Sequence, residues 1–397
     1  MKDRVIFVLD SRLTFSEAPA SRFIYIAKSL KEKGFEVEVV GGKGERIAGL
    51  KTHQLGGSRH LSRLKILLFT YAETLSHSCN TIIARGYLAF FLLPLKIFGT
   101  RIILDFHGWL YREIRFFFGK SKYNKLKIFL YYVVERVGAR YSSTMICVSK
   151  GVKDSLGQEE KAKSIILENG VDINESKIAA QEAETEKEKI YSEYHIPKEK
   201  TFIGFLGNWE RRLDMETLFE GSKAAGVCLV VIGEGPRLNE FRNRWNNVVF
   251  PGKLPRFEAL KIISLCAAAV APYRKAYTFT SFWSQRKVKD YLSLGRPILM
   301  ADVREREAYL APNKNVLLYQ PGNPQDLANK MNSIISDKIL AEEMRQNNLK
   351  LAQQFDWQIL VDKSGLAGKI RNQKPQKPHF RPRHFSDTTS QEESSQK

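Results

Sequence analysis

The chain has 397 residues, with 63 Lys and Arg against 43 Asp and Glu, which gives a formal net charge of +20. At roughly 100–200 residues per domain, this length predicts two domains, or three. Hydrophobic residues make up 43% and charged residues 27% of the chain, a composition that excludes global disorder. The four cysteines are scattered without C-x-x-C spacing, which argues against a disulfide framework and against a zinc site.

The positive charge falls into two separate blocks. Residues 51–150 hold 16 basic and 4 acidic side chains and residues 251–300 hold 9 and 2, whereas residues 151–200 hold 8 and 12. Such a surplus suits nucleic acid, an anionic membrane or a negatively charged small molecule. The longest apolar run, residues 87–98, is too short and too interrupted to span a bilayer, and the N-terminus shows no signal-peptide pattern.

Short apolar runs alternate with helical stretches along the first half of the chain. The first unit is a strand at 5–9, a helix from Arg22 to Lys33 and a strand at 37–40. Further strands are expected at 82–84, 102–104, 145–148 and 165–167. Strands that alternate with helices indicate a parallel sheet covered on both faces.

A polar stretch at 173–200 interrupts the alternation, and we interpret it as a surface helix and linker between an N-terminal domain at 1–172 and a second domain at 201–354. In the second domain, strands are expected at 202–206, 227–232, 248–250, 267–271, 298–300 and 316–319. Two doubly wound domains place a ligand cleft between their strand carboxyl ends. The tail, 372–397, is polar and is predicted to be disordered.

The second domain carries the sharpest motifs. Two strands end in glycine loops, at Gly207 and in the run Ile-Gly-Glu-Gly-Pro (232–236), and such loops let a backbone approach a nucleotide closely. Arg211 and Arg212 follow the first loop. The segment 284–298 contains Lys287 and Asp290, which lie on one helical face. The lysine suits a diphosphate and the carboxylate suits two vicinal hydroxyls.

This order of motifs, with Lys-x-x-Asp-Tyr-Leu-x-x-Gly-Arg-Pro-Ile at 287–298, resembles the retaining GT-B glycosyltransferases of the sucrose-synthase and mannosyltransferase family. The resemblance covers roughly residues 1–368. It implies two Rossmann-like domains facing a central cleft and a final helix, 355–371, that crosses back to the first domain. It also implies transfer of a sugar from a nucleotide diphosphate donor with retention, without a metal or a separate cofactor.

The same resemblance assigns roles to individual residues. The catalytic candidates are His107, Arg212 and Lys287, and the donor-binding candidates are Gly207, Arg211, Gly233, Glu234, Ser284 and Asp290. The family's Glu eight residues before the ribose carboxylate is Phe282 here. That departure motivates the alternative of a non-catalytic GT-B scaffold or regulator of a membrane glycan assembly complex.

Each of these residues also has a simpler interpretation. His107 could be a structural histidine, Lys287 and Asp290 an ordinary surface ion pair, and the two arginines solvated side chains. Glu234 is typical of a residue that shapes a loop.

Aromatic residues alternate with lysines between Arg112 and Arg140, a composition that favours a membrane interface over a plain core helix. No nucleic-acid-binding motif is present, so nucleic acid ranks last among the partners. We therefore expect a cytoplasmic enzyme, peripheral at the inner face of the membrane, acting on a lipid-linked or cell-envelope acceptor.

Overall fold

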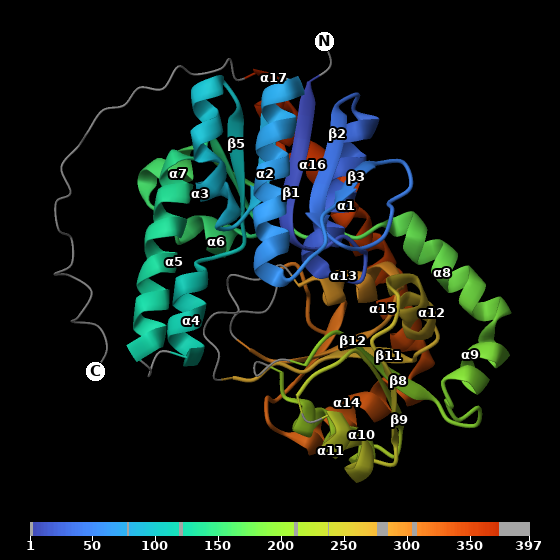
Figure 1. The fold of residues 1–397 in the computed structure, drawn as a ribbon. Coiled ribbons are helices and arrows are strands. Elements are labelled where there is room, and N and C mark those ends of the chain that lie inside the picture. The colour runs from blue at the N-terminus through green and yellow to red at the C-terminus, as the bar shows by residue number, and fades with distance from the viewer. Residues whose placement is uncertain are drawn as a thin grey trace.

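The computed structural model describes residues 3–77, 79–118, 122–209, 213–236, 238–275, 285–303 and 308–372. It contains two α/β domains, one above the other in Figure 1, each built around a sheet whose strand pairs are all parallel. The strand orders are β3-β2-β1-β4-β5-β6-β7 and β10-β9-β8-β11-β12-β13. The predicted pair of doubly wound domains is confirmed.

The N-terminal domain follows the predicted alternation. Its elements are β1 (Arg4–Arg12), α1 (Ala18–Glu32), β2 (Glu36–Gly42), β3 (Lys51–Gln54), α2 (Arg59–His77), β4 (Thr81–Arg85), α3 (Leu88–Leu92), η1 (Leu93–Phe98), β5 (Arg101–Phe106), α4 (Leu110–Phe118), α5 (Lys122–Tyr141), β6 (Thr144–Cys147), α6 (Lys150–Asp154), α7 (Gln158–Ala162) and β7 (Ser164–Ile166). Helix α1 begins four residues before the predicted Arg22, because Pro19 suits a first helical turn.

The remaining elements build the C-terminal domain and the return of the chain. They are α8 (Ile173–Thr185), α9 (Lys187–Glu193), β8 (Phe202–Leu206), α10 (Met215–Ala224), β9 (Cys228–Ile232), α11 (Leu238–Arg244), β10 (Val248–Gly252), α12 (Arg256–Ser264), β11 (Ala268–Ala271), α13 (Arg286–Ser293), β12 (Ile298–Ala301), β13 (Val316–Tyr319), α14 (Pro324–Ser336), α15 (Lys338–Ala352), η3 (Gln353–Phe355), α16 (Trp357–Ser364) and α17 (Leu366–Asn372). All six strands lie where the apolar runs predict them.

Alternating side chains of the buried strands fill two cores in the N-terminal domain. Phe7 of β1 packs with Phe23 of α1 on one face of the sheet, while Val8 packs with Ile66 of α2 on the other. This two-sided burial explains why the strands are continuously apolar. The four cysteines are buried free thiols.

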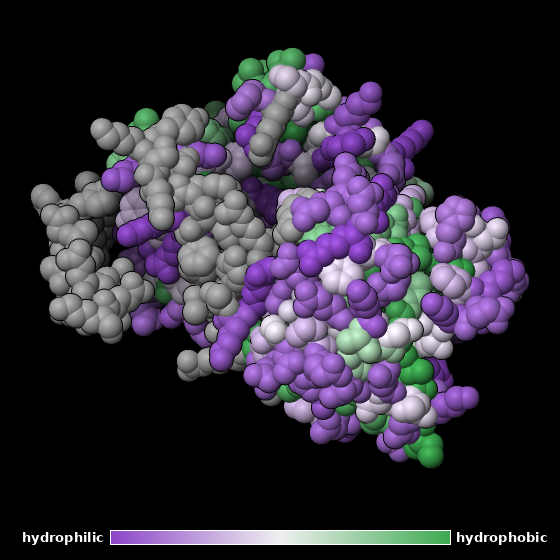
Figure 2. Space-filling view, turned by 90° about the horizontal axis from the view of Figure 1, so that it is seen from below, coloured by the Kyte–Doolittle hydropathy of each residue, from purple (hydrophilic) through white to green (hydrophobic). Residues whose placement is uncertain are grey.

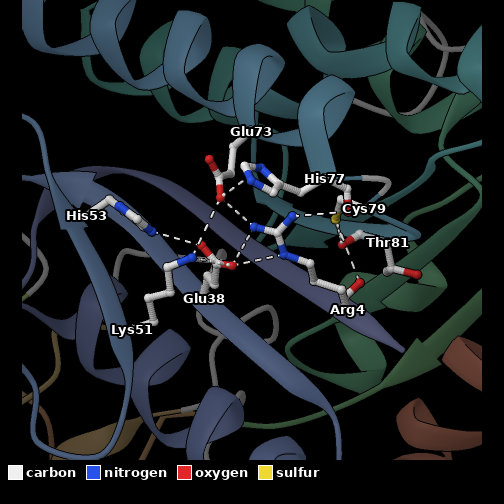
Figure 3. A network of polar contacts seen from close by, with 8 residues as sticks. All are labelled: Arg4, Glu38, Lys51, His53, Glu73, His77, Cys79 and Thr81. Atoms are coloured by element: carbon white, nitrogen blue, oxygen red, sulfur yellow. Dashed lines mark hydrogen bonds and ion pairs between the residues drawn. The ribbon is translucent and has the colours of Figure 1, made fainter. Parts of the chain in front are cut away.

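Strand β3 was not predicted, because it is polar and only half-buried. A charge network at the opposite end of the sheet from the cleft holds it (Figure 3). Glu38 of β2 is completely buried and accepts from Arg4 Nε at 2.9 Å, Lys51 Nζ at 3.1 Å and His53 Nε2 at 2.8 Å. Burial would raise the pKa of Glu38, but these donors lower it. The edge strand is thus fixed by ion pairs rather than by apolar packing.

Two chain segments connect the domains, and they run side by side. The Val171 amide donates to the Phe355 carbonyl at 3.0 Å, and the Trp357 amide donates to Val171 at 3.2 Å. Phe355 is buried in the C-terminal core and Trp357 in the N-terminal core. Helices α8 and α9 occupy the stretch 173–200, and their buried residues, among them Ala183, also join the C-terminal core.

Candidate active site

A cleft of about 770 Å³ opens between the two domains. From the N-terminal domain it is lined by residues that follow β1, β4 and β5, and from the C-terminal domain by the loops after β8 and β9 and the start of α13. The strand order reverses between β1 and β4 and again between β8 and β11. Doubly wound sheets bind ligands at this position, beyond the strand carboxyl ends.

The two glycine loops on the C-terminal side touch each other. Gly207 and Gly233 have φ angles of 131° and 135°, in the region that favours glycine. A Cβ atom on Gly233 would lie 2.3 Å from the Gly207 carbonyl oxygen. Both positions therefore require glycine, and both line the cleft. Glu234 is exposed and does not line it.

Helix α13 brings Lys287 and Asp290 to the cleft together. The Lys287 ammonium lies 4.6 Å from the Phe205 ring centre and within 3.4 Å of the place where a Cβ of Gly207 would stand. This placement directs a cation at the first glycine loop. Asp290 is 2% exposed, so the ordinary surface ion pair is not the environment of this carboxylate.

Asp290 is held by an arginine that the sequence motifs did not reveal. Arg256, at the start of α12, donates from Nη2 to Asp290 Oδ1 at 2.8 Å and from Nη1 to Oδ2 at 3.1 Å. Its Nε donates to Glu175 at 2.9 Å, and Glu175 accepts from the Tyr25 hydroxyl at 2.7 Å. Burial opposes the charge of Arg256, but Asp290 and its neighbours raise its pKa. A cation in the first turn of a helix interacts unfavourably with the helix dipole. The position of Arg256 at the start of a helix was therefore the sequence signal that could have indicated a special role.

The N-terminal side of the cleft carries His107, directly after β5. Its Nε2 lies 2.7 Å from Asp105 Oδ2, and Asp105 also accepts from Arg22 Nη2 at 3.0 Å. Burial alone would raise the pKa of Asp105, but Arg22 and His107 hold it well below its usual range. Burial lowers the pKa of His107. The contact with the Asp105 carboxylate fixes the orientation of the imidazole ring.

A second carboxylate on this side is close to neutrality. Glu135 of α5 lines the cleft and accepts the amides of Leu110 and Tyr111, both at 3.1 Å, at the start of α4. Burial raises its pKa to about 7. The carboxyl group stabilises the first turn of α4, whose free amides need an acceptor.

The structure thus brings His107, Lys287, Asp290 and the two glycine loops to one cleft. Arg211, Arg212, Ser284 and Phe282 lie outside the described residues. Within the described ranges, no group of three or more His, Cys, Asp or Glu is arranged to hold a metal ion.

Residues 200–337 match the family model of glycosyl transferases group 1. The matched segment lies within the C-terminal domain and covers about a third of the chain. A curated relative, an uncharacterized glycosyltransferase of Methanocaldococcus jannaschii, is 22% identical over 225 residues, which cover 55% of this chain and 57% of the relative. The match therefore spans little more than half of the relative's length.

Solved glycosyltransferase structures share the whole architecture. The sucrose-phosphate synthase of Thermosynechococcus elongatus superposes with a TM-score of 0.70 at 14% identity, covering 93% of this chain and 98% of that one. Anabaena HepE, solved with UDP-glucose, gives 0.66 at 17% identity, covering 91% and 98%. WaaG, a glycosyltransferase involved in lipopolysaccharide biosynthesis, gives 0.67 at 15% identity, covering 93% and 100%. These likenesses establish the GT-B fold.

Proposed function

We propose that the protein transfers a sugar from a nucleotide diphosphate donor to a lipid-linked or cell-envelope glycan acceptor, with retention and without a metal. The observation that carries this proposal is the shared cleft, where Lys287 and the glycine loops of the family domain face His107 of the other domain. The bond between the anomeric carbon and the diphosphate breaks as the bond to an acceptor hydroxyl oxygen forms, and the proton of that hydroxyl passes to the leaving phosphate oxygen. A fixed lysine stabilises the charge that grows on the leaving diphosphate.

Asp290 supplies the second half of donor recognition. Each oxygen of the Asp290 carboxylate accepts one hydrogen bond from Arg256. Each oxygen can accept a further hydrogen bond, which leaves capacity for a ribose hydroxyl. The Arg256 pair also orients the carboxylate before the donor arrives. Preorganised groups of this kind reduce the ordering cost of binding.

A thermal-shift screen tests donor binding. UDP-glucose, UDP, GDP and ADP are added separately, with UDP-glucose chosen because the HepE structure contains it. One of these should raise the midpoint, and Lys287→Met should abolish most of the rise. Lys223→Met, an exposed lysine on α10, is the matched control and should leave the rise intact. If no nucleotide stabilises the wild type, the enzyme proposal fails. Product mass with a lipid-linked acceptor then tests transfer.

We further propose that the N-terminal domain rests on an anionic membrane. Among the described residues, most of the exposed large apolar side chains lie on α2, α3–η1 and α5, three neighbouring elements. They are Leu61, Leu64, Leu68, Leu75, Phe91, Ile97, Phe98, Leu126, Phe129, Leu130, Tyr132, Val133 and Tyr141, which we call the apolar surface. By contrast, the coloured residues on the face seen from below in Figure 2 are mainly hydrophilic.

The charge around the apolar surface is complementary to anionic lipid. Helix α5 carries five Lys or Arg and one Glu, and Lys65 of α2 is exposed. Leu126, Phe129 and Val133 repeat at helical spacing, so they form one outward stripe. Apolar side chains beside cations suit a membrane interface. In the described part of the chain, no helix is long and apolar enough to span a bilayer.

Vesicle cosedimentation tests the membrane proposal. The protein should bind vesicles that contain phosphatidylglycerol, bind weakly to pure phosphatidylcholine, and release as salt rises. Leu68→Glu combined with Phe129→Glu should remove binding, whereas Ile339→Glu, a 75% exposed isoleucine on α15, should not. Equal binding by both variants contradicts the proposal. A concentration-dependent dimer that the double variant breaks would instead assign the apolar surface to self-association.

A further inference from the structure

Within the part of the chain that the structure describes, one arginine of the cleft makes no hydrogen bond or ion pair. Arg85 is the last residue of β4, lines the cleft and is partly buried. Burial lowers its pKa. Among the described residues, no hydrogen bond or ion pair joins Arg85 to another group, although its strand neighbour in the β4–β5 register is Asp105. The charges of Asp105 and Asp10 favour this cation, but a partly buried guanidinium that makes no hydrogen bond to the protein needs an explanation.

The carboxylates nearest to Arg85 are already taken. Asp105 is bound by Arg22 and His107. Asp10, at the end of β1, accepts from Arg63 Nη2 at 2.7 Å and from the Tyr87 hydroxyl. Both of these carboxylates thus have other arginines as hydrogen-bond partners, and among the described residues Arg85 makes no hydrogen bond to either of them.

We propose that Arg85 binds an oxyanion of the acceptor, so that the molecule glycosylated in this cleft carries a phosphate group near its reacting hydroxyl. The planar guanidinium fork matches a phosphate in bidentate geometry. Arg85 belongs to the N-terminal domain, across the cleft from the glycine loops and Lys287 that are assigned to the donor. This inference rests on the proposed function and specifies its acceptor class.

The phosphate could come from a lipid headgroup or from a soluble sugar phosphate, and both present the same chemistry to Arg85. The membrane-facing apolar surface makes the first source accessible. Two probes separate them: glucose 6-phosphate, and phosphatidic acid in mixed micelles. Binding of each is measured by calorimetry, with and without a saturating nucleoside diphosphate.

The wild type should bind one of the two probes, and Arg85→Gln should weaken that binding by about tenfold or more, because a charge-assisted contact is lost. Nucleotide affinity should stay within about twofold, since the donor lies on other residues. Arg46→Gln, which removes an exposed charge elsewhere on the same domain, should behave as the wild type.

Stability provides an independent readout with a definite sign. Arg85→Gln should leave the ligand-free thermal midpoint unchanged or raise it, because the substitution breaks no hydrogen bond or ion pair among the described residues and removes a partly buried cation. Arg63→Gln should lower it, because that change breaks the pair with Asp10. A clear drop with Arg85→Gln would make Arg85 a structural ion-pair residue and overturn the inference.

The remaining outcomes are also decisive. If neither probe binds, or if Arg85→Gln binds as the wild type does, the phosphate acceptor is wrong while donor binding stands. If nucleotide affinity falls together with probe affinity, Arg85 belongs to the donor site. If no nucleotide binds the wild type, the proposed function fails, and the titrations without nucleotide still report on Arg85.

Discussion

Replacing Arg256 with methionine tests whether one buried ion pair both stabilises the C-terminal domain and prepares its carboxylate. The Arg256 side chain is 8% exposed and that of Asp290 is 3% exposed. Arg256→Met would leave Asp290 buried without its cation and would remove a partner of Glu175. Removing one member of a buried pair costs about 3–5 kcal/mol, so we expect a loss of about 3 kcal/mol in the free energy of unfolding.

A double-mutant cycle with Asp290→Asn isolates the pair. Each single variant should lose about 3 kcal/mol, and the double variant should lose clearly less than the sum, with a coupling energy of about 2 kcal/mol. Urea unfolding followed by tryptophan fluorescence gives these values. The matched control is Arg345→Met, which breaks an exposed pair with Glu342 at 2.7 Å and should cost about 1 kcal/mol or less. If the losses in the free energy of unfolding at Arg256 and Asp290 are additive, or if Arg345→Met costs as much as Arg256→Met, the two residues do not form a stabilising buried pair.

Three further predictions concern the cleft. Gly233→Ala should abolish the nucleotide-induced rise in the thermal midpoint, because the added Cβ would meet the Gly207 carbonyl. Gly226→Ala, at a glycine with a φ of 70° and open space around it, should retain that rise. Both variants are measured by thermal shift. The second prediction concerns Glu135, whose pKa is raised to about 7. Its contribution to the free energy of unfolding should therefore be present at pH 4 and lost as pH rises through 7. In urea titrations, the wild type should lose roughly 3 kcal/mol between pH 4 and 8 relative to Glu135→Gln. The third prediction concerns His107, whose lowered pKa makes the folded protein lose stability as pH falls below about 6.5, so His107→Asn should reduce that loss. The same variant should lower kcat at least about tenfold and leave nucleotide affinity unchanged. Unchanged kcat would leave His107 a structural residue, and an identical pH profile would contradict its burial.

The stretch 112–140 shows how much of the proposed membrane surface can be inferred from composition. The aromatic and basic residues of 112–140 indicated an interface, and the exposed residues of α5 are consistent with that prediction. The contribution of α2 and η1 to the apolar surface could not be inferred from the sequence, because Leu68 and Phe98 look there like ordinary core residues. Only the packing of α3 between α2 and α5 places them on a common surface.

The sequence by itself indicated every strand except β3, as well as the two domains and the glycine loops, because hydrophobic periodicity and the need for positive φ are local properties of the chain. It also placed Lys287 and Asp290 on one helix. The tertiary structure decided which charges are paired. Arg256 lies 34 residues from Asp290, and Arg22 lies 83 residues from Asp105. These pairs exist because parallel strands bring distant loops to one edge, and burial there sets the cost of each unpaired charge. For the same reason the unpartnered Arg85, and the acceptor phosphate we infer from it, could be recognised only in the folded chain.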